Sequence, residues 1–284
     1  MTPEFYSTMA EWTAARRTFA TATIVRVEGS SSAKPGAKAL IDSVGKIVLG
    51  WVGGGCAESA VRQEALRCMA LERPEVITLD MMDEVAGVGM PCGGKMEVFI
   101  EPVVPQPELL IVGHGRIAEA LAQMASLTGF AITVNDPGAE AARFPKAARV
   151  VNEDFDLVET PVGPRTYVVV ATLHKNDHVW LEKALAGNAA YVALIASRHR
   201  SKIVLDLVAE RGADATSLAA VWAPAGLDLG AATPEEIALS IVSQMVALRR
   251  GGTAGSLKEA GASATDDAAM DRVIYQCEAD AAAD

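Results

Sequence analysis

Residues 109–118 read LLIVGHGRIA, and this stretch decides the fold of the second half of the chain. Its four leading apolar residues predict a buried strand, and Gly113, Gly115 and Ala118 then fit the pattern G-x-G-x-x-A. The first glycine permits a tight turn, the second lets backbone approach a pyrophosphate, and the alanine lets the next helix pack closely on the sheet. The stretch therefore predicts a Rossmann-like domain whose helix N-terminus favours an anionic ligand, although such folds also serve as scaffolds.

Strands and helices alternate through the rest of this region, which predicts a doubly wound parallel sheet and the fold class α/β. Asp136 ends the second predicted strand, about 20 residues after the glycines, where an acid can bind a ribose hydroxyl of NAD(P). The elements predicted after residue 112 are helix 116–128, strand 131–135, a strand at Val150, strand 167–171, helix 176–186, strand 191–195, and helices 199–211 and 234–249.

A smaller domain is predicted in the first part of the chain. Apolar spacing indicates an amphipathic helix from Phe5 to Phe19, followed by short β-branched runs bounded by turn residues. We expect a small α/β domain with a mixed sheet. Its further elements are predicted as strand 21–27, a hairpin over 37–49, helix 57–72, and strands 76–79 and 96–100.

Three prolines in residues 102–108 mark the predicted domain boundary, because proline fits neither a regular helix nor a central strand. The N-terminal domain is therefore predicted over residues 1–103 and the Rossmann-like domain over 108–250. From Gly251 the chain is rich in glycine, alanine, serine and acids, so 251–284 is predicted to be an acidic, flexible tail.

The composition excludes several classes of protein. The chain has 284 residues and a net charge of -11, which argues against nucleic acid or an anionic membrane as the main partner. We recognise no signal peptide, and no apolar stretch approaches the roughly 20 residues of a membrane span. The four cysteines form no disulfide framework, and no histidine has a metal-ligand spacing with them. We expect a cytoplasmic protein with reduced thiols, and Cys68 buried inside its helix.

Two cysteines lie in glycine-rich stretches: Cys56 follows Gly54 and Gly55, and Cys92 precedes Gly93. Glycine has no side chain to pack, so such stretches can bring a thiol and backbone N–H groups close to a ligand. Cys56 also begins a predicted helix, where a thiolate is stabilised, and a thiolate is both a nucleophile and a ligand for soft metals. The alternative is a small residue packed in a tight turn.

Polar residues also follow the later strands of the predicted sheet. His174 lies at a carboxyl end, where it could carry a proton, contact a ligand or bind a metal. Asp177 is predicted to cap the next helix. Arg198, Arg200 and Lys202 form a basic cluster that could bind phosphate or could remain solvated at a helix start.

These stretches together resemble the XdhC/CoxI family of accessory proteins, which mature molybdenum hydroxylases such as xanthine dehydrogenase and CO dehydrogenase. The similarity runs from about residue 21 to residue 249. Its N-terminal motifs are GSS at 29–31, KPGAK at 34–38, GGCAE at 54–58, CGG at 92–94 and MEVFIEP at 96–102. Its later motifs are GHG at 113–115, His174 with Asp177, Ser197 with Arg198, PAGLDLG at 224–230 and TPEEIA at 233–238.

The resemblance implies a chaperone of the molybdenum cofactor, in the form of molybdopterin or molybdopterin cytosine dinucleotide. Family members protect this cofactor, assist exchange of an oxo ligand for sulfur with a cysteine desulfurase, and deliver it to the apo-molybdenum hydroxylase. A homodimer is expected. Cys56, with Cys92 second, would then meet the molybdenum or handle sulfur.

The same resemblance suggests residues for the anionic tail of the cofactor. Lys34 and Lys38 would act as point charges, Arg198 as a bidentate clamp, and the Gly113 loop through its backbone. The two domains would close a crevice around the ligand.

Two alternatives belong to other classes of function. One is an NAD(P)-dependent oxidoreductase that uses Gly113 and Asp136 for the nucleotide and His174 for acid–base chemistry. The other is an assembly scaffold that binds proteins and no cofactor.

Overall fold

The computed structural model describes residues 2–29, 33–80, 94–152 and 154–258. The chain divides into two compact units, Met1–Gln106 and Pro107–Asp284, and the division falls inside the proline-rich segment 102–108. Among the described helices, none combines the length and the apolar character that a membrane span requires. Residues 259–284 lie outside the described part, so the flexible tail stays a prediction.

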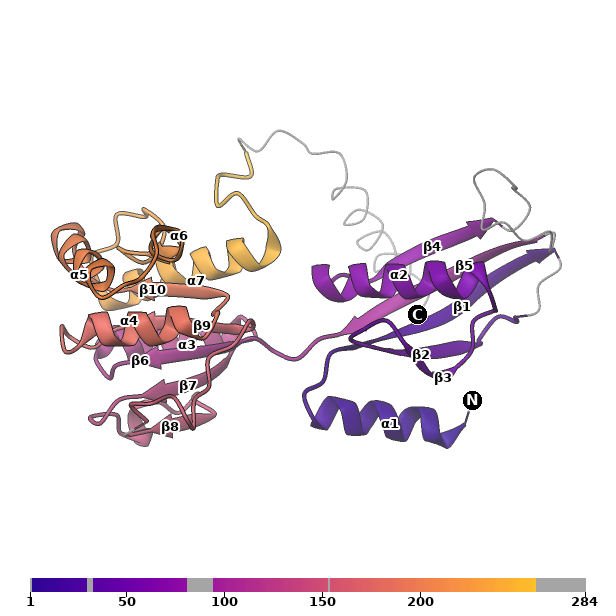
Figure 1. The fold of residues 1–284 in the computed structure, drawn as a ribbon, viewed down its shortest axis with the longest axis horizontal. Helices are drawn as coiled ribbons and strands as arrows, with labels where there is room; N and C mark the ends of the chain where they lie inside the picture. Colours follow the sequence, from indigo (N-terminus) through magenta and orange to yellow (C-terminus); the bar gives the residue numbers. More distant parts are fainter. Residues whose placement is uncertain (1, 30–32, 81–93, 153, 259–284) are drawn as a thin grey trace, which may run out of the picture. The chain divides into compact units, whose positions relative to one another are not determined.

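The first unit is built on a five-stranded sheet with the order β3-β2-β1-β5-β4 (Figure 1). We expected mixed strand directions here, but the four described pairs are all antiparallel. Short connections between β1, β2 and β3 explain two of these pairs, because parallel neighbours need a long crossover. The strands are β1 Phe19–Gly29, β2 Lys38–Asp42, β3 Ile47–Gly50, β4 Glu75–Asp80 and β5 Gly94–Val103.

Two helices pack on opposite faces of this sheet. Alternate residues of a strand point to opposite faces, so Ile24 contributes to the core that contains Val61 of α2. Phe19 and Leu40 instead pack with Trp12 of α1. The helices are α1 Pro3–Ala14 and α2 Cys56–Leu71.

The first helix is shorter than predicted, because it ends at Ala14 instead of continuing to Phe19. Arg16 takes a left-handed φ of 52°, and this turn directs the chain into β1. The rings of Trp12 and Phe19 then meet edge to face with centroids 5.5 Å apart. The apolar spacing that suggested one long helix therefore reflects a contact between a helix and a strand.

The second unit contains six parallel strands in the order β11-β10-β9-β6-β7-β8. Counted from β6, this is the Rossmann order, and the order reverses between β6 and β9. Ligands of open parallel sheets bind at the carboxyl ends of the strands beside such a reversal. The strands are β6 Glu108–Val112, β7 Ala131–Asn135, β8 Arg149–Val151, β9 Thr166–Val170, β10 Tyr191–Leu194 and β11 Val221–Trp222.

Helices cover both faces of this parallel sheet, as the predicted α/β class requires (Figure 1). Ile111 of β6 packs with Leu121 of α3 and Ile241 of α7 in one core. Leu110, the preceding residue, packs with Leu181 of α4 in the core on the other face. The helices are α3 Arg116–Leu127, α4 Asp177–Ala186, α5 Arg198–Glu210, α6 Ala215–Ala219 and α7 Pro234–Arg250, with a short 3-10 helix η1 at Ala141–Arg143.

Gly113 should be required for this fold. Its φ is +140°, and a Cβ at this position would lie 2.2 Å from the carbonyl oxygen of Ala171 in the neighbouring loop. We expect Gly113→Ala to lower the free energy of unfolding by about 3 kcal/mol or more, because the clash adds to a backbone strain of about 1–2 kcal/mol. Urea denaturation followed by tryptophan fluorescence measures this loss.

Gly129→Ala is the matched control. Gly129 also has a positive φ, +84°, but nothing lies within 4 Å of an added Cβ. This variant should lose only the backbone contribution of about 1–2 kcal/mol. Equal losses in the two variants would contradict a close approach of the β6 and β9 loops at Gly113.

Candidate functional site

Three cavities lie along the carboxyl edge of the parallel sheet. Their volumes are about 550, 350 and 480 Å³, and we name them the Arg198, His174 and Asp136 cavities. All three are within the size range of small-molecule sites, which is roughly 300–1,000 Å³. The Arg198 cavity is lined by residues 195–198, 224–231, 237 and 240, the His174 cavity by 115–118, 171, 173, 174 and 195, and the Asp136 cavity by 114, 135–138, 155, 172, 175, 176 and 180.

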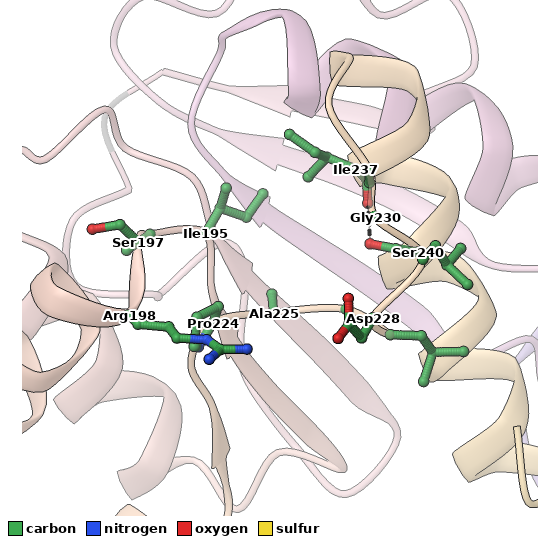
Figure 2. A pocket seen from close by; sticks show the side chains of 14 residues that line it. Ile195, Ser197, Arg198, Pro224, Ala225, Asp228, Gly230, Ile237 and Ser240 are labelled. Atoms are coloured by element: carbon green, nitrogen blue, oxygen red, sulfur yellow. Dashed lines mark hydrogen bonds between the residues drawn. The ribbon is translucent and has the colours of Figure 1, made fainter.

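Two segments form the walls of the Arg198 cavity (Figure 2). One is the start of α5, where the Ser197 hydroxyl accepts a hydrogen bond from the Arg200 backbone N–H and Arg198 is the first helical residue. The other is the loop 223–233 between β11 and α7. Figure 2 shows the Arg198 side chain extending toward the side of the cavity on which Asp228 lies, whereas the Ser197 hydroxyl points away.

Hydrogen bonds to α7 fix this loop. The Gly226 N–H donates to Gln244 Oε1 at 3.0 Å, and the same oxygen accepts from the Tyr191 hydroxyl at 2.6 Å. The Leu227 N–H donates to the Ser240 carbonyl at 3.2 Å. Gly226 has a φ of +99°, and a Cβ there would lie 2.3 Å from Ser240 Oγ. The loop therefore depends on glycine at this position for its close approach to α7.

The basic cluster predicted after β10 has three different surroundings. Arg200 pairs with Asp177, and Lys202 pairs with a carboxylate one turn later on the same helix. Arg198 forms no hydrogen bond or ion pair through its side chain with any residue that the structure describes, and the same holds for Asp228. The Arg198 cavity thus contains one cation and one anion that are free to meet a ligand.

The Asp177 carboxylate is buried, with 3% of its side chain exposed, and it is bonded from two sides. Arg200 Nε and Nη2 lie 3.2 and 3.0 Å from Oδ2, and the Thr172 hydroxyl donates to Oδ1. The predicted helix-capping role is wrong, because Asn176 occupies the N-cap in a left-handed conformation. The Asp177 side chain instead ties the loop after β9 to α5.

The loop after β9 has an unusual backbone. Leu173, His174 and Asn176 all have positive φ, at 54°, 77° and 58°. Leucine and histidine rarely hold this conformation unless their surroundings enforce it, whereas asparagine adopts it more readily. Arg200 Nη2 supplies one such contact by donating to the His174 carbonyl at 3.2 Å. His174 lies where we predicted it, at the carboxyl edge, and lines the His174 cavity with Gly115, the N-cap of α3.

Asp136 also lies at its predicted place, directly after β7, but one of its oxygens is already bonded. Oδ1 lies 2.5 Å from His114 Nδ1 and accepts the Gly138 N–H at 2.7 Å. The His114 ring covers Gly138, where an added Cβ would come within 2.8 Å of the ring. A ribose hydroxyl would therefore compete with an imidazole for this oxygen. The pair of His114 and Asp136 was not predicted from the sequence.

The two lysines predicted to hold an anionic tail differ in their contacts. Lys38 Nζ donates to Thr23 Oγ1 at 2.8 Å, which ties it to the neighbouring strand. Lys34 is exposed, and its ammonium has no partner among the described residues. Lys34 thus has all three N–H donors free of described partners, whereas Lys38 uses one of its three on Thr23.

The glycine-rich stretch 53–55 lies directly before α2. Gly54 and Gly55 are exposed, and Gly55 has φ 60° and ψ −127°, a conformation that glycine adopts readily. Cys56 is the first residue of α2, as predicted. Cys92 and Gly93 lie outside the described residues. Among the described residues, no group of three or more His, Cys, Asp or Glu is placed to hold a metal ion.

Cys68 is buried inside α2, which confirms the prediction. Burial, together with the nearby Glu64 carboxylate, raises the pKa of the Cys68 thiol to about 11. The thiol therefore stays protonated at neutral pH and is a poor nucleophile and metal ligand.

Both units match known sequence families. Residues 109–245 match the XdhC Rossmann domain, and residues 12–80 match the XdhC and CoxI family. The chain belongs to the XdhC and CoxI family. The matched regions include the start of α2, with the motif at 54–58, and the Arg198 cavity, with the motifs at 197–198 and 224–230.

Relatives of the chain include two longer bacterial proteins. An uncharacterized protein of Escherichia coli K12, YqeB, is 33% identical over 84% of this chain and 44% of its own length. A Bacillus subtilis protein, named as a probable subunit of xanthine dehydrogenase, is 32% identical over 54% of this chain and 46% of its own length. The chain thus spans less than half the length of these relatives.

A crystal structure titled as a xanthine dehydrogenase from Bacillus halodurans is also similar to this chain. The sequences are 23% identical, and the TM-score is 0.47. The match covers 88% of this chain and 97% of that chain.

We expect Arg200→Met to lower the free energy of unfolding by about 3 kcal/mol, at the low end of the range for breaking a buried pair because Arg200 is partly exposed. Lys202→Met is the matched control on the same helix, since its ion pair is exposed and should contribute less than about 1 kcal/mol. Urea denaturation compares the variants. Similar losses of unfolding free energy in the two variants would show that the buried Asp177 carboxylate does not need Arg200 as its partner.

Cys68 should be silent in thiol labelling of the native protein. At pH 8, wild type and Cys68→Ala should release the same amount of chromophore from Ellman's reagent, because the Cys68 thiol is buried and protonated. After unfolding in guanidinium, wild type should show one more reactive thiol per chain than Cys68→Ala. A rapidly reacting thiol lost in native Cys68→Ala would contradict the prediction.

Proposed function

We propose that this protein is a maturation factor for a molybdenum hydroxylase of the xanthine dehydrogenase type. It binds the molybdenum cofactor as a homodimer, assists its sulfuration with a cysteine desulfurase, and delivers it to the apo-hydroxylase. One observation carries the proposal: the family motifs at 197–198 and 224–230 form the two walls of a single cavity. The B. subtilis relative, whose name refers to xanthine dehydrogenase, supports the class of partner.

The donors of the Arg198 cavity fit the anionic end of the cofactor. Arg198 has no partner among the described residues, so a phosphate would not have to displace a carboxylate from it. A guanidinium can bind two phosphate oxygens in one plane. The backbone N–H groups at the start of α5 add the positive end of a helix dipole.

The start of α2 fits a different part of the cofactor. Cys56 begins the helix after the exposed Gly54 and Gly55, and a helix N-terminus favours a thiolate. Lys34 offers a free ammonium in the same unit. When bound, the cofactor supplies the molybdenum centre on which an oxo ligand is replaced by sulfur. We assign the metal end to Cys56, with Cys92 second.

The proposal predicts that Arg198 and Cys56 act on cofactor loading. Arg198→Met should reduce the molybdopterin that copurifies with the protein by at least about tenfold, since charge-assisted hydrogen bonds contribute about 1.5–3 kcal/mol. Cys56→Ala and Cys92→Ala should lower hydroxylase activity in the cell by reducing sulfurated cofactor. Molybdopterin is measured by fluorescence after oxidative release from protein purified from its native host. Cys68→Ala serves as the thiol control and should behave like wild type.

The same preparation separates the two alternative functions. An oxidoreductase should release NAD(P) instead of a pterin and should turn over a small carbonyl substrate. A scaffold should bind apo-hydroxylase and release no cofactor. Normal loading and normal hydroxylase maturation in Arg198→Met, Cys56→Ala and Cys92→Ala would end the proposal.

A further inference from the structure

The Arg198 cavity contains an anion that the phosphate assignment does not use. Asp228 is exposed in the loop 223–233, and its carboxylate has no hydrogen bond or ion pair within the described part of the chain. Figure 2 shows Asp228 on the side of the cavity toward which Arg198 extends. The two opposite charges line one cavity without forming a salt bridge to each other.

Hydrogen bonds hold the backbone that carries each of these charges. Arg198 is the first residue of a helix whose N-cap is Ser197, and Asp228 follows the two residues bonded to α7, Gly226 and Leu227. The rest of the cavity lining includes the apolar side chains of Ile195, Pro224 and Ile237. A ligand that bridges the charges would therefore be anionic at one end, rich in N–H donors at the other, and apolar on its faces.

We propose that Asp228 binds the amino edge of a 2-amino-4-oxopyrimidine ring, the ring that pterins and guanine share. In this ring a ring N–H and an adjacent exocyclic NH₂ point in the same direction. An ionised carboxylate only accepts hydrogen bonds, and its two oxygens match two parallel donors. Arg198 then binds the phosphate of the same ligand. The inference rests on the proposed function and extends it by assigning a specificity residue.

Purine nucleotides test this assignment because they differ at one ring edge. GMP carries the N–H and the NH₂, IMP carries the N–H alone, and AMP presents a ring nitrogen that would repel a carboxylate. We expect calorimetric titration of the full chain to give affinities in the order GMP, IMP, AMP. GMP should bind at least about tenfold more tightly than AMP, as expected for hydrogen bonds to a charged group. Neopterin monophosphate should share the preference of GMP.

Two variants separate recognition of the ring from recognition of the phosphate. Asp228→Asn should bring the GMP-to-AMP affinity ratio close to one, because one of the two carboxylate acceptors is replaced by an NH₂ donor that cannot pair with a ring donor. Arg198→Met should weaken GMP and AMP by a similar factor and keep their ratio. Asp206→Asn, an exposed carboxylate on α5 that is paired with Lys202, is the control and should keep both affinities.

The inference is overturned if wild type binds GMP and AMP equally, if the GMP preference survives in Asp228→Asn, or if none of the four ligands binds. Tighter binding of neopterin monophosphate than of GMP supports a pterin as the natural ligand, and the reverse supports a guanine nucleotide. The two proposals can also fail separately. If the protein carries no cofactor in the cell but prefers GMP in a way that requires Asp228, the proposed function is wrong and the ring specificity stands.

Discussion

The ion pair between Asp177 and Arg200 is the constraint on which the carboxyl edge of the parallel sheet depends. Asp177 is buried, and burying a carboxylate costs several kcal/mol unless it is paired and hydrogen-bonded. Arg200 satisfies this requirement from α5 and also holds the carbonyl of His174, inside a loop with three left-handed residues. One guanidinium therefore connects the loop after β9 to the start of α5, two residues from Arg198.

This connection explains how a basic cluster can contain one cation that is free to bind. Arg198, Arg200 and Lys202 look alike in the sequence, yet Arg200 leaves the helix on a different face from the other two, because residues two apart do not share a helix face whereas residues four apart do. Arg200 meets the buried carboxylate, Lys202 stays on the surface with Asp206, and Arg198 lines the cavity. The ion pair that fixes the start of α5 therefore also fixes the backbone position of Arg198.

Much of the fold follows from local patterns in the sequence. The apolar run before Gly113 and the alternation after it predicted the parallel sheet, since burial on both faces produces such runs. The five-residue helix α6 and the two-residue strand β11 were missed because they are too short to show a period. The partner of Asp177 was missed for another reason: Arg200 lies 23 positions away, and only the sheet order brings them together.

The pair of His114 and Asp136 bears on which cavity of a Rossmann-like sheet takes the ligand. A fold does not determine its ligand, and here the acid usually associated with a ribose already accepts two hydrogen bonds at Oδ1 from the protein itself. Binding a ribose hydroxyl at Oδ1 would require breaking or sharing these bonds, which leaves Oδ2 as the acceptor without a described partner. A ligand that binds Arg198 and Asp228 would break no hydrogen bond or ion pair of their side chains, because neither side chain has a partner among the described residues. The Arg198 cavity differs from the Asp136 cavity in that the protein offers both an unpaired donor and an unpaired acceptor to one ligand there.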